Sequence, residues 1–173
     1  IIYWVFKSKI KIQNSILLIS SYVFYGWWDW RFLSLIIFSS FVDYIVGLQL
    51  SKNEDKNKRK LLLLTSILIN LGFLGFFKYF NFFAENFARA FTLLGSNFEQ
   101  TRLNIILPVG ISFYTFQTLS YSIDVYKKKL EPTKDIIAFF AFVSFFPQLV
   151  AGPIERATNL LPQFYKKRTF EYH

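Results

Sequence analysis

An apolar run at residues 61–77 (LLLLTSILINLGFLGFF) constrains the fold more than any other feature of this chain. Its only polar residues are Thr, Ser and Asn, and it carries no charge. A helical run of about 18 such residues is long enough to cross the hydrocarbon core of a bilayer. The chain is also 53% hydrophobic and 21% aromatic, with 23 phenylalanines, which is unusual for a soluble domain. The sequence therefore predicts an all-α, polytopic transmembrane helical bundle.

Other apolar runs divide the chain into predicted spans near residues 12–28, 32–50, 61–83 and 105–126, followed by a shorter run at 136–152. Basic residues collect between the spans, at 7–11, 51–60 and 127–134. Basic loops favour the cytoplasmic side of a membrane, and belts of Trp and Tyr favour its interfaces. The three basic segments are therefore predicted on one side. The aromatic turn at Asp29 and Arg31 and a surface loop at 84–104, with one or two amphipathic turns, are predicted on the other.

The stretch at residues 144–163 (SFFPQLVAGPIERATNLLPQ) cannot be one continuous helix, because Pro147, Pro153 and Pro162 interrupt it. A residue before proline is pushed out of the α region, so Gly152 is a predicted break point. Non-helical backbone at membrane depth must be buried in protein or line a wet cavity. A full crossing by 136–152 would carry Arg156 and the basic residues after it to the outer side. We therefore expect a broken, re-entrant element near Pro147–Pro153, with a full crossing as the alternative.

Polar and ionisable side chains inside apolar spans indicate functional sites, because they are costly to bury in a membrane. The candidates for a substrate tunnel or a buried polar role are Asp43, Gln117, Asp124, Gln148 and Arg156. Asp43 is the deepest, and we expect it to be a buried partner for a basic group on a helix that these residues lack. The alternatives are that Gln117 joins helices, that Asp124 pairs near Lys127 and that Arg156 faces water. Lys78 is expected to extend to the interface beside Tyr79.

Several classes of chemistry find no support in the sequence. The chain has no cysteine, which excludes disulfides and thiolate metal sites, and its single histidine is the terminal His173. No nucleophile motif, phosphate-binding glycine loop or metal-ligand spacing is present. The net charge of +9 is concentrated between apolar runs, which favours membrane topology over nucleic-acid binding. We expect no catalytic residue, metal site or bound cofactor in these residues.

Five segments resemble the membrane-bound O-acyltransferase family, in its bacterial alginate O-acetyltransferase-like branch. They are YVFYGWWDWRFL (22–33), FSSFVDYIVGL (38–48), NLGFLGFFKYFNFF (70–83), LPVGISFYTFQTLSYSIDVY (107–126) and FVSFFPQLVAGPIERATNLLPQF (142–164). The resemblance implies a multi-pass protein of the bacterial inner membrane, with helices around a tunnel. It also implies a catalytic histidine in a Trp-Arg-Arg-Trp-His type motif downstream, which these residues lack.

The resemblance implies an N-terminal part of an enzyme that passes acetyl groups to an exported polysaccharide such as alginate. The chain has no methionine and opens on an apolar stub at residues 1–6, so we expect a fragment that is inactive alone. The expected partners are membrane lipid, the exported polysaccharide and periplasmic or extracellular acetylation proteins. The resemblance implies an acyl donor such as acetyl-CoA or a similar compound, without fixing which one. The alternatives are D-alanyl transfer to teichoic acid and a non-catalytic scaffold or transporter-like subunit.

Overall fold

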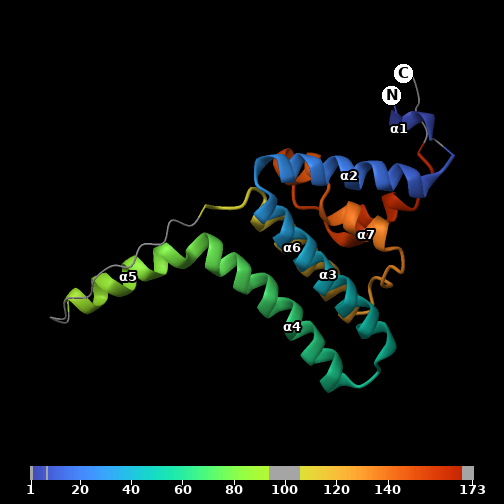
Figure 1. Ribbon diagram of the computed structural model, residues 1–173. Coiled ribbons are helices and arrows are strands. Elements are labelled where there is room, and N and C mark those ends of the chain that lie inside the picture. The colour runs from blue at the N-terminus through green and yellow to red at the C-terminus, as the bar shows by residue number, and fades with distance from the viewer. Residues whose placement is uncertain (1, 7, 94–105, 169–173) are drawn as a thin grey trace.

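The computed structural model describes residues 2–6, 8–93 and 106–168, and all secondary structure in these ranges is helical (Figure 1). The predicted all-α class is thus confirmed. In chain order the elements are α1 (Ile2–Val5), α2 (Ile10–Trp28), α3 (Trp30–Lys52), α4 (Lys56–Leu74), the π-helical turn η1 (Gly75–Tyr79), α5 (Phe80–Leu93), α6 (Ile111–Tyr126), α7 (Ile136–Val143), α8 (Phe146–Ala151), α9 (Ala157–Leu160) and the 3-10 turn η2 (Leu161–Phe164).

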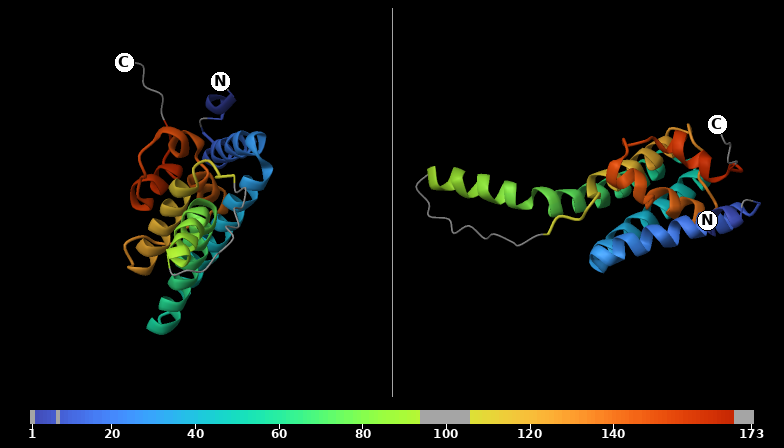
Figure 2. Two further views of the ribbon diagram at one scale, coloured as in Figure 1. Left: turned by 90° about the vertical axis from the view of Figure 1, so that its left-hand side faces the viewer. Right: turned by 90° about the horizontal axis from the view of Figure 1, so that it is seen from above.

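The bundle is built around α3 and α6, which pack against each other and against α4 (Figures 1 and 2). Helix α2 covers α3 and α7. The aromatic core joins α6 to α7, where the rings of Tyr121 and Phe139 lie 4.6 Å apart and both side chains are completely buried. Gly47 of α3 makes this packing possible, because a Cβ there would lie only 2.5 Å from the Tyr121 hydroxyl.

Aspartate side chains begin three of the helices. Asp29 accepts a hydrogen bond of 2.9 Å from the backbone N–H of Arg31 at the start of α3. Asp55 and Asp135 cap α4 and α7 in the same way, since a carboxylate satisfies N–H groups that have no partner within the helix. The side chain of Arg31 also binds Asp29 at 2.9 Å, and this hydrogen bonding lowers the pKa of Asp29.

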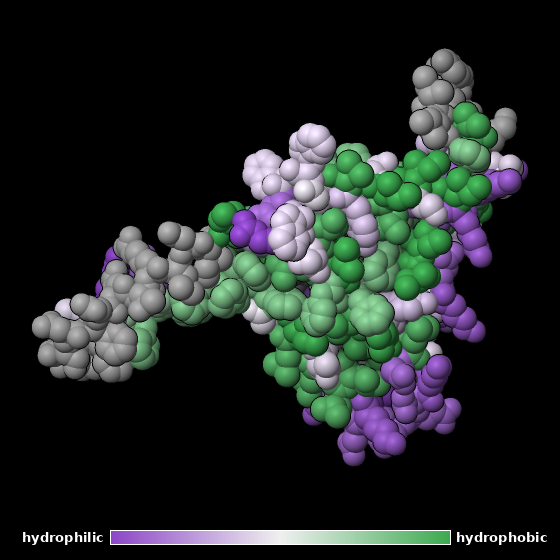
Figure 3. Space-filling model, in the orientation of Figure 1, coloured by the Kyte–Doolittle hydropathy of each residue, from purple (hydrophilic) through white to green (hydrophobic). Residues whose placement is uncertain are grey.

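Within the described ranges, two helical stretches are long and apolar enough to cross a membrane, namely Trp30–Lys52 and Lys56–Ala90. Apolar residues cover most of the visible surface of the bundle, and hydrophilic residues gather at its lower and right-hand edges (Figure 3). Large apolar side chains such as those of Phe41 and Leu68 are 49% and 70% accessible. Lipid tails solvate such an outer surface, so this distribution is that of a membrane protein.

Two boundaries differ from the prediction. Residues 84–93, predicted as part of a surface loop, continue the helix through α5, whereas residues 94–104 lie outside the described ranges. The predicted span at 105–126 becomes helical only at Ile111. A turn at Pro108–Gly110 precedes it, and Gly110 adopts a φ of 75°, a left-handed conformation that glycine tolerates best.

The element after α6 is broken, as its prolines predict. The α8 helix ends at Ala151, and Gly152 is extended. A second break falls at Ser144 and Phe145, which leaves Pro147 in the first turn of α8, where proline is tolerated. The ends of the element lie side by side, because the hydroxyls of Thr133 and Tyr165 are hydrogen-bonded. The chain therefore returns to the end of the bundle from which α7 starts.

Candidate functional site

A cluster of buried polar side chains lies where α3, α4 and α6 meet. At its centre, Asp43 of α3 is completely buried. Its Oδ1 accepts hydrogen bonds from the hydroxyls of Ser66 in α4 and Ser122 in α6, the latter at 3.0 Å. Its Oδ2 accepts a bond of 2.7 Å from Nδ2 of Asn70, one turn further along α4. One carboxyl group thus joins three helices.

Asn70 extends the same network. Its Oδ1 accepts hydrogen bonds from Ser39 at 2.7 Å and from Thr118 at 3.0 Å. Neutral donors therefore surround Asp43, and no basic side chain of the described residues contacts it. The partner predicted on a helix outside these residues stays a prediction. In apolar surroundings such bonds hold helices in register, and each one is costly to leave unmade.

A second polar link connects α6 to the broken element. Gln117 is buried, and its Nε2 donates to the carbonyl of Phe142 at 2.8 Å and to Oε1 of Gln148 at 3.4 Å. Gln148 donates in turn to the carbonyl of Pro153 at 3.1 Å. These bonds satisfy carbonyls at which the helical hydrogen bonding stops. Gln117 and Gln148 therefore hold the broken element against α6.

The other predicted residues lie apart from these two links. Asp124 is buried in the last turn of α6, where Oδ2 has no partner among the described residues and the predicted pairing with Lys127 does not form. Arg156 is exposed at the start of α9. Lys78 donates to Oγ of Ser112 at 3.0 Å and lies 5.5 Å from the ring centre of Tyr79. Neither Arg156 nor Lys78 reaches the Asp43 cluster.

Sequence reasoning missed Arg59, which it counted only as part of a basic loop. This side chain is 7% exposed and donates to the carbonyl of Leu50, near the end of α3. It also donates to the carbonyl of Tyr126 at 2.6 Å and lies 5.5 Å from its ring centre. A cation is favourable at helix C-termini, where unpaired carbonyls concentrate negative charge. Arg59 therefore fastens together the ends of α3 and α6, and no sequence motif marks it.

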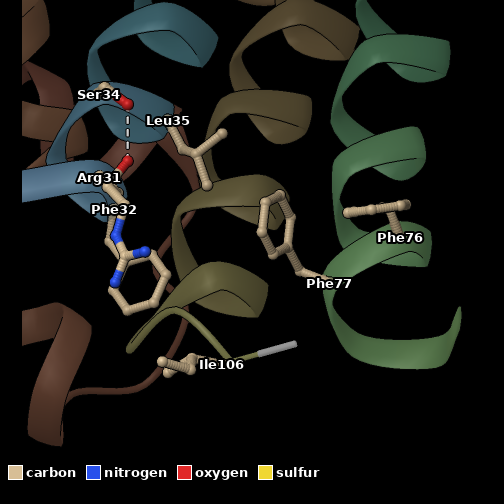
Figure 4. A pocket seen from close by; sticks show the side chains of 7 residues that line it. All are labelled: Arg31, Phe32, Ser34, Leu35, Phe76, Phe77 and Ile106. Carbon is tan, nitrogen blue, oxygen red and sulfur yellow. Dashed lines mark hydrogen bonds between the residues drawn. The ribbon is translucent and has the colours of Figure 1, made fainter. Parts of the chain in front are cut away.

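Two cavities lie near the opposite end of α3, and both are lined mainly by apolar side chains. The first, of about 420 Å³, is lined by Arg31, Phe32, Ser34, Leu35, Phe76, Phe77 and Ile106 (Figure 4). The second, of about 840 Å³, is lined by Val23, Phe24, Tyr25, Trp27, Trp28, Phe32, Val109 and Val150. Neither is lined by any of the five candidate residues. The buried polar residues and the cavities thus occupy different parts of the bundle.

The described residues form no group of three His, Cys, Asp or Glu side chains that could hold a metal. His173 lies outside the described ranges. The Asp43 cluster consists of a carboxylate, hydroxyls and an amide whose hydrogen bonds are made to one another. Such a cluster can orient helices, but it leaves no side chain poised to attack a substrate. The geometry supports a positioning role for these residues.

Comparison with known proteins relates nearly the whole chain to bacterial O-acetyltransferases. It is 40% identical over 161 residues to the probable alginate O-acetylase AlgI of Pseudomonas syringae pv. tomato, and equally identical to that of Pseudomonas aeruginosa. It is 33% identical over 175 residues to the peptidoglycan O-acetyltransferase of Helicobacter pylori. These alignments cover 92%, 92% and 87% of this chain. No family model and no solved structure matches.

The all-α bundle, its apolar outer surface and its broken proline-rich element define a helical membrane protein. The relatives make the assignment more specific. The chain's similarity to the alginate O-acetylases, over 92% of its length, supports an assignment to the membrane-bound O-acyltransferase family. The chain spans about a third of the length of these relatives, 31% for both Pseudomonas proteins and 32% for the Helicobacter protein.

Proposed function

We propose that this chain forms the N-terminal helices of an integral membrane enzyme that O-acetylates an exported polysaccharide. The observation that carries the proposal is the 40% identity to alginate O-acetylases over 92% of the chain. The proline-rich stretch within the related region is the one that the structure shows as a broken element fixed to α6. The chain thus supplies a shaped segment of the fold as well as apolar spans.

In the proposed reaction, the oxygen of a sugar hydroxyl attacks the acyl carbon of a thioester such as acetyl-CoA. The new C–O ester bond forms, the C–S bond breaks, and the thiol leaves. A general base takes the hydroxyl proton and returns it to the departing thiolate. The base belongs to the family's histidine motif, outside these residues. The residues described here keep the helices in register around the path of the acyl group.

The acceptor is proposed to be alginate or a similar exported polymer, with periplasmic or extracellular acetylation proteins as partners. Peptidoglycan is the second candidate, because the Helicobacter pylori relative is named as a peptidoglycan O-acetyltransferase. To distinguish the two, the whole protein that contains this chain would be expressed in hosts that lack their own polysaccharide O-acetylase. Acetyl esters would then be measured by NMR on exported polymer and on purified peptidoglycan. Esters on neither acceptor would overturn the proposal.

A matched variant connects this activity to the chain. Gln148→Ala removes the bonds to Gln117 and to the carbonyl of Pro153 and should lower acetylation without lowering the amount of protein in the membrane. Gln163→Ala is the control, because Gln163 is exposed and bonds only to the carbonyl of Asn159, in its own turn. Equal acetylation by the two variants would remove the role assigned to the Gln117–Gln148 link.

We also propose a multi-pass arrangement in the bacterial inner membrane, with residues 136–152 entering and leaving on the cytoplasmic side. The contact of Thr133 with Tyr165 supports this arrangement, since it brings the two ends of the element together. Single cysteines at Lys56 and Lys167 should react with an impermeant maleimide from the same side of the membrane. Labelling from opposite sides would show that the element crosses the bilayer completely.

A further inference from the structure

Two basic segments that lie far apart in the sequence meet at one end of the bundle. Residues 8–11 include the start of α2, and residues 165–168 follow η2. Asn14 of α2 joins them, because its Nδ2 donates to the carbonyl of Phe164 and its Oδ1 accepts from Nη2 of Arg168, both at 2.8 Å. Asn14 is only 1% exposed. A buried contact therefore holds the two segments side by side.

Further contacts fix the same junction. The guanidinium carbon of Arg168 lies 5.7 Å from the ring centre of Tyr3 and 5.5 Å from that of Phe164. A guanidinium over an aromatic ring is attracted to it, which adds to the hydrogen bond with Asn14. Gln13 donates to the carbonyl of Tyr3 at 3.2 Å, so α1 is fastened at this point too. The two basic segments thus stand on an anchored backbone.

Four exposed lysines flank this junction, namely Lys9, Lys11, Lys166 and Lys167. Among the described residues, none of the four lysines has an ion-pair partner. Residues 1–28 and 156–168 contain no Asp or Glu. Glu131 and Asp135 line a cavity beside Tyr165, but neither lies within ion-pair distance of these lysines. The described residues therefore leave the positive charge of this surface uncompensated.

The four lysines lie at the edge of the apolar surface. Lys9 directly precedes α2, which carries no charge between Lys11 and its end at Trp28. Figure 3 shows hydrophilic residues along the right-hand edge of the bundle, on the side where α2 begins in Figure 1. Lysines at such an edge reach the headgroups of a bilayer while their stems contact apolar surface. This position places the four ammonium groups at the depth of lipid phosphates.

We propose that these four lysines form a binding site for the headgroup of an anionic phospholipid, in the leaflet that this end of the bundle faces. Each ammonium group donates hydrogen bonds to phosphate oxygens, and charge-assisted bonds of this kind are strong. Basic clusters beside membrane helices recognise anionic headgroups in this way. A lipid is favoured over a soluble phosphate compound, because the adjoining apolar surface contacts its acyl chains. The site requires a membrane but does not depend on the acetylation proposed above.

Charge alone would not single out this surface, because the loop 51–60 is also basic. That loop has four exposed lysines of its own, namely Lys52, Lys56, Lys58 and Lys60. It also contains Glu54 and Asp55, which offset part of their charge. The junction at Asn14, in contrast, brings together two segments that contain no acidic residue. The loop therefore provides a control that matches the site in its number of lysines and differs in what surrounds them.

The test compares the lipid affinities of the whole membrane protein that contains this chain. Purified protein in detergent is titrated with dioleoyl-phosphatidylglycerol or with zwitterionic dioleoyl-phosphatidylcholine, and the bound lipid is counted by native mass spectrometry. One variant carries glutamine at the four lysines of the site, and a second carries arginine there, which keeps the charge. The control variant carries glutamine at the four lysines of the loop 51–60. Glycerol phosphate, added as a competitor, tests for a site that binds soluble phosphates.

The wild type should bind phosphatidylglycerol at least about tenfold more tightly than phosphatidylcholine, since each lysine near a headgroup contributes about fivefold in affinity. The glutamine variant of the site should lose this preference, whereas the arginine variant and the loop variant should keep it. An equal loss in the loop variant would show that only the total charge matters and would overturn the proposal. An unchanged preference in the glutamine variant, as expected if other protein covers the lysines, would also overturn it. So would loss of the preference in the arginine variant, or displacement of the lipid by glycerol phosphate.

Discussion

Replacing Asp43 by alanine removes the acceptor of three hydrogen bonds that join α3 to α4 and α6. An average interhelical hydrogen bond in a membrane protein contributes about 0.6 kcal/mol, so three bonds account for about 2 kcal/mol. The stranded donors of Ser66, Asn70 and Ser122 are buried, and they raise the expected loss to about 3–5 kcal/mol. Asp43→Ala should therefore reduce the folding equilibrium constant by at least about 150-fold.

A graded pair of variants makes this prediction specific. Asp43→Asn keeps a carbonyl oxygen for Ser66 and Ser122, and a rotated amide of Asn70 can accept from the new side-chain NH₂, so its loss should be less than half that of Asp43→Ala. Ser34→Ala is the control, because Ser34 is exposed and donates only to the carbonyl of Arg31. Surface changes of this kind alter stability by about 0.5 kcal/mol or less.

Unfolding would be followed by tryptophan fluorescence during titration of detergent-solubilised protein with SDS. The expected order of stability is wild type and Ser34→Ala, then Asp43→Asn, then Asp43→Ala. If Asp43→Ala unfolds within about 0.5 kcal/mol of the wild type, the hydrogen bonds around Asp43 do not hold the three helices together, and the positioning role fails.

Three further variants follow from close contacts in the structure. Gly47→Ala should destabilise the bundle by about 1–3 kcal/mol through overpacking against Tyr121. Adding Tyr121→Phe should recover part of this loss in the same SDS titration. No recovery would exclude the contact with Tyr121 as the cause. Arg59→Ala should lower the free energy of unfolding by about 3 kcal/mol, and Arg59→Lys by less, because the guanidinium donates to carbonyls at the ends of both α3 and α6. Thermal unfolding measures both changes. Melting temperatures equal to that of the wild type would contradict this expectation. Gly152→Ala should increase proteolysis after α8, because a Cβ would lie 2.9 Å from Cα of Gln148, a backbone atom that cannot move aside. An unchanged rate of cleavage would contradict this prediction.

The features predicted from sequence are those that a local pattern determines. The run at 61–77 must be helical if it crosses a membrane, because no other conformation satisfies its backbone there. The prolines around Gly152 forbid a continuous helix whatever surrounds them. Both predictions depend on the covalent chain and its solvent, so they required no knowledge of neighbouring elements.

One missed feature depends on tertiary contacts. Arg59 resembles its basic neighbours in sequence and becomes special only because the ends of α3 and α6 meet beside it. The interruption near Pro147 was predicted, and it falls at Ser144 and Phe145, before Pro147, because proline fits the first turn of a new helix. Residues 84–93 carry enough polar groups to resemble a loop, but their phenylalanines recur at helical spacing.

The separation between polar links and apolar cavities bears on where an acyl group can pass. Gln117 was a candidate for the lining of a hydrophilic tunnel, but its amide is buried against Phe142 and Gln148. Asp43 is likewise enclosed by donors on its own bundle. A buried polar group that already has its partners has nothing to offer a passing substrate, and exposing it would cost those bonds. In the proposed enzyme, Asp43 and Gln117 would therefore hold helices in place, and the apolar cavities near Phe32 lie apart from both.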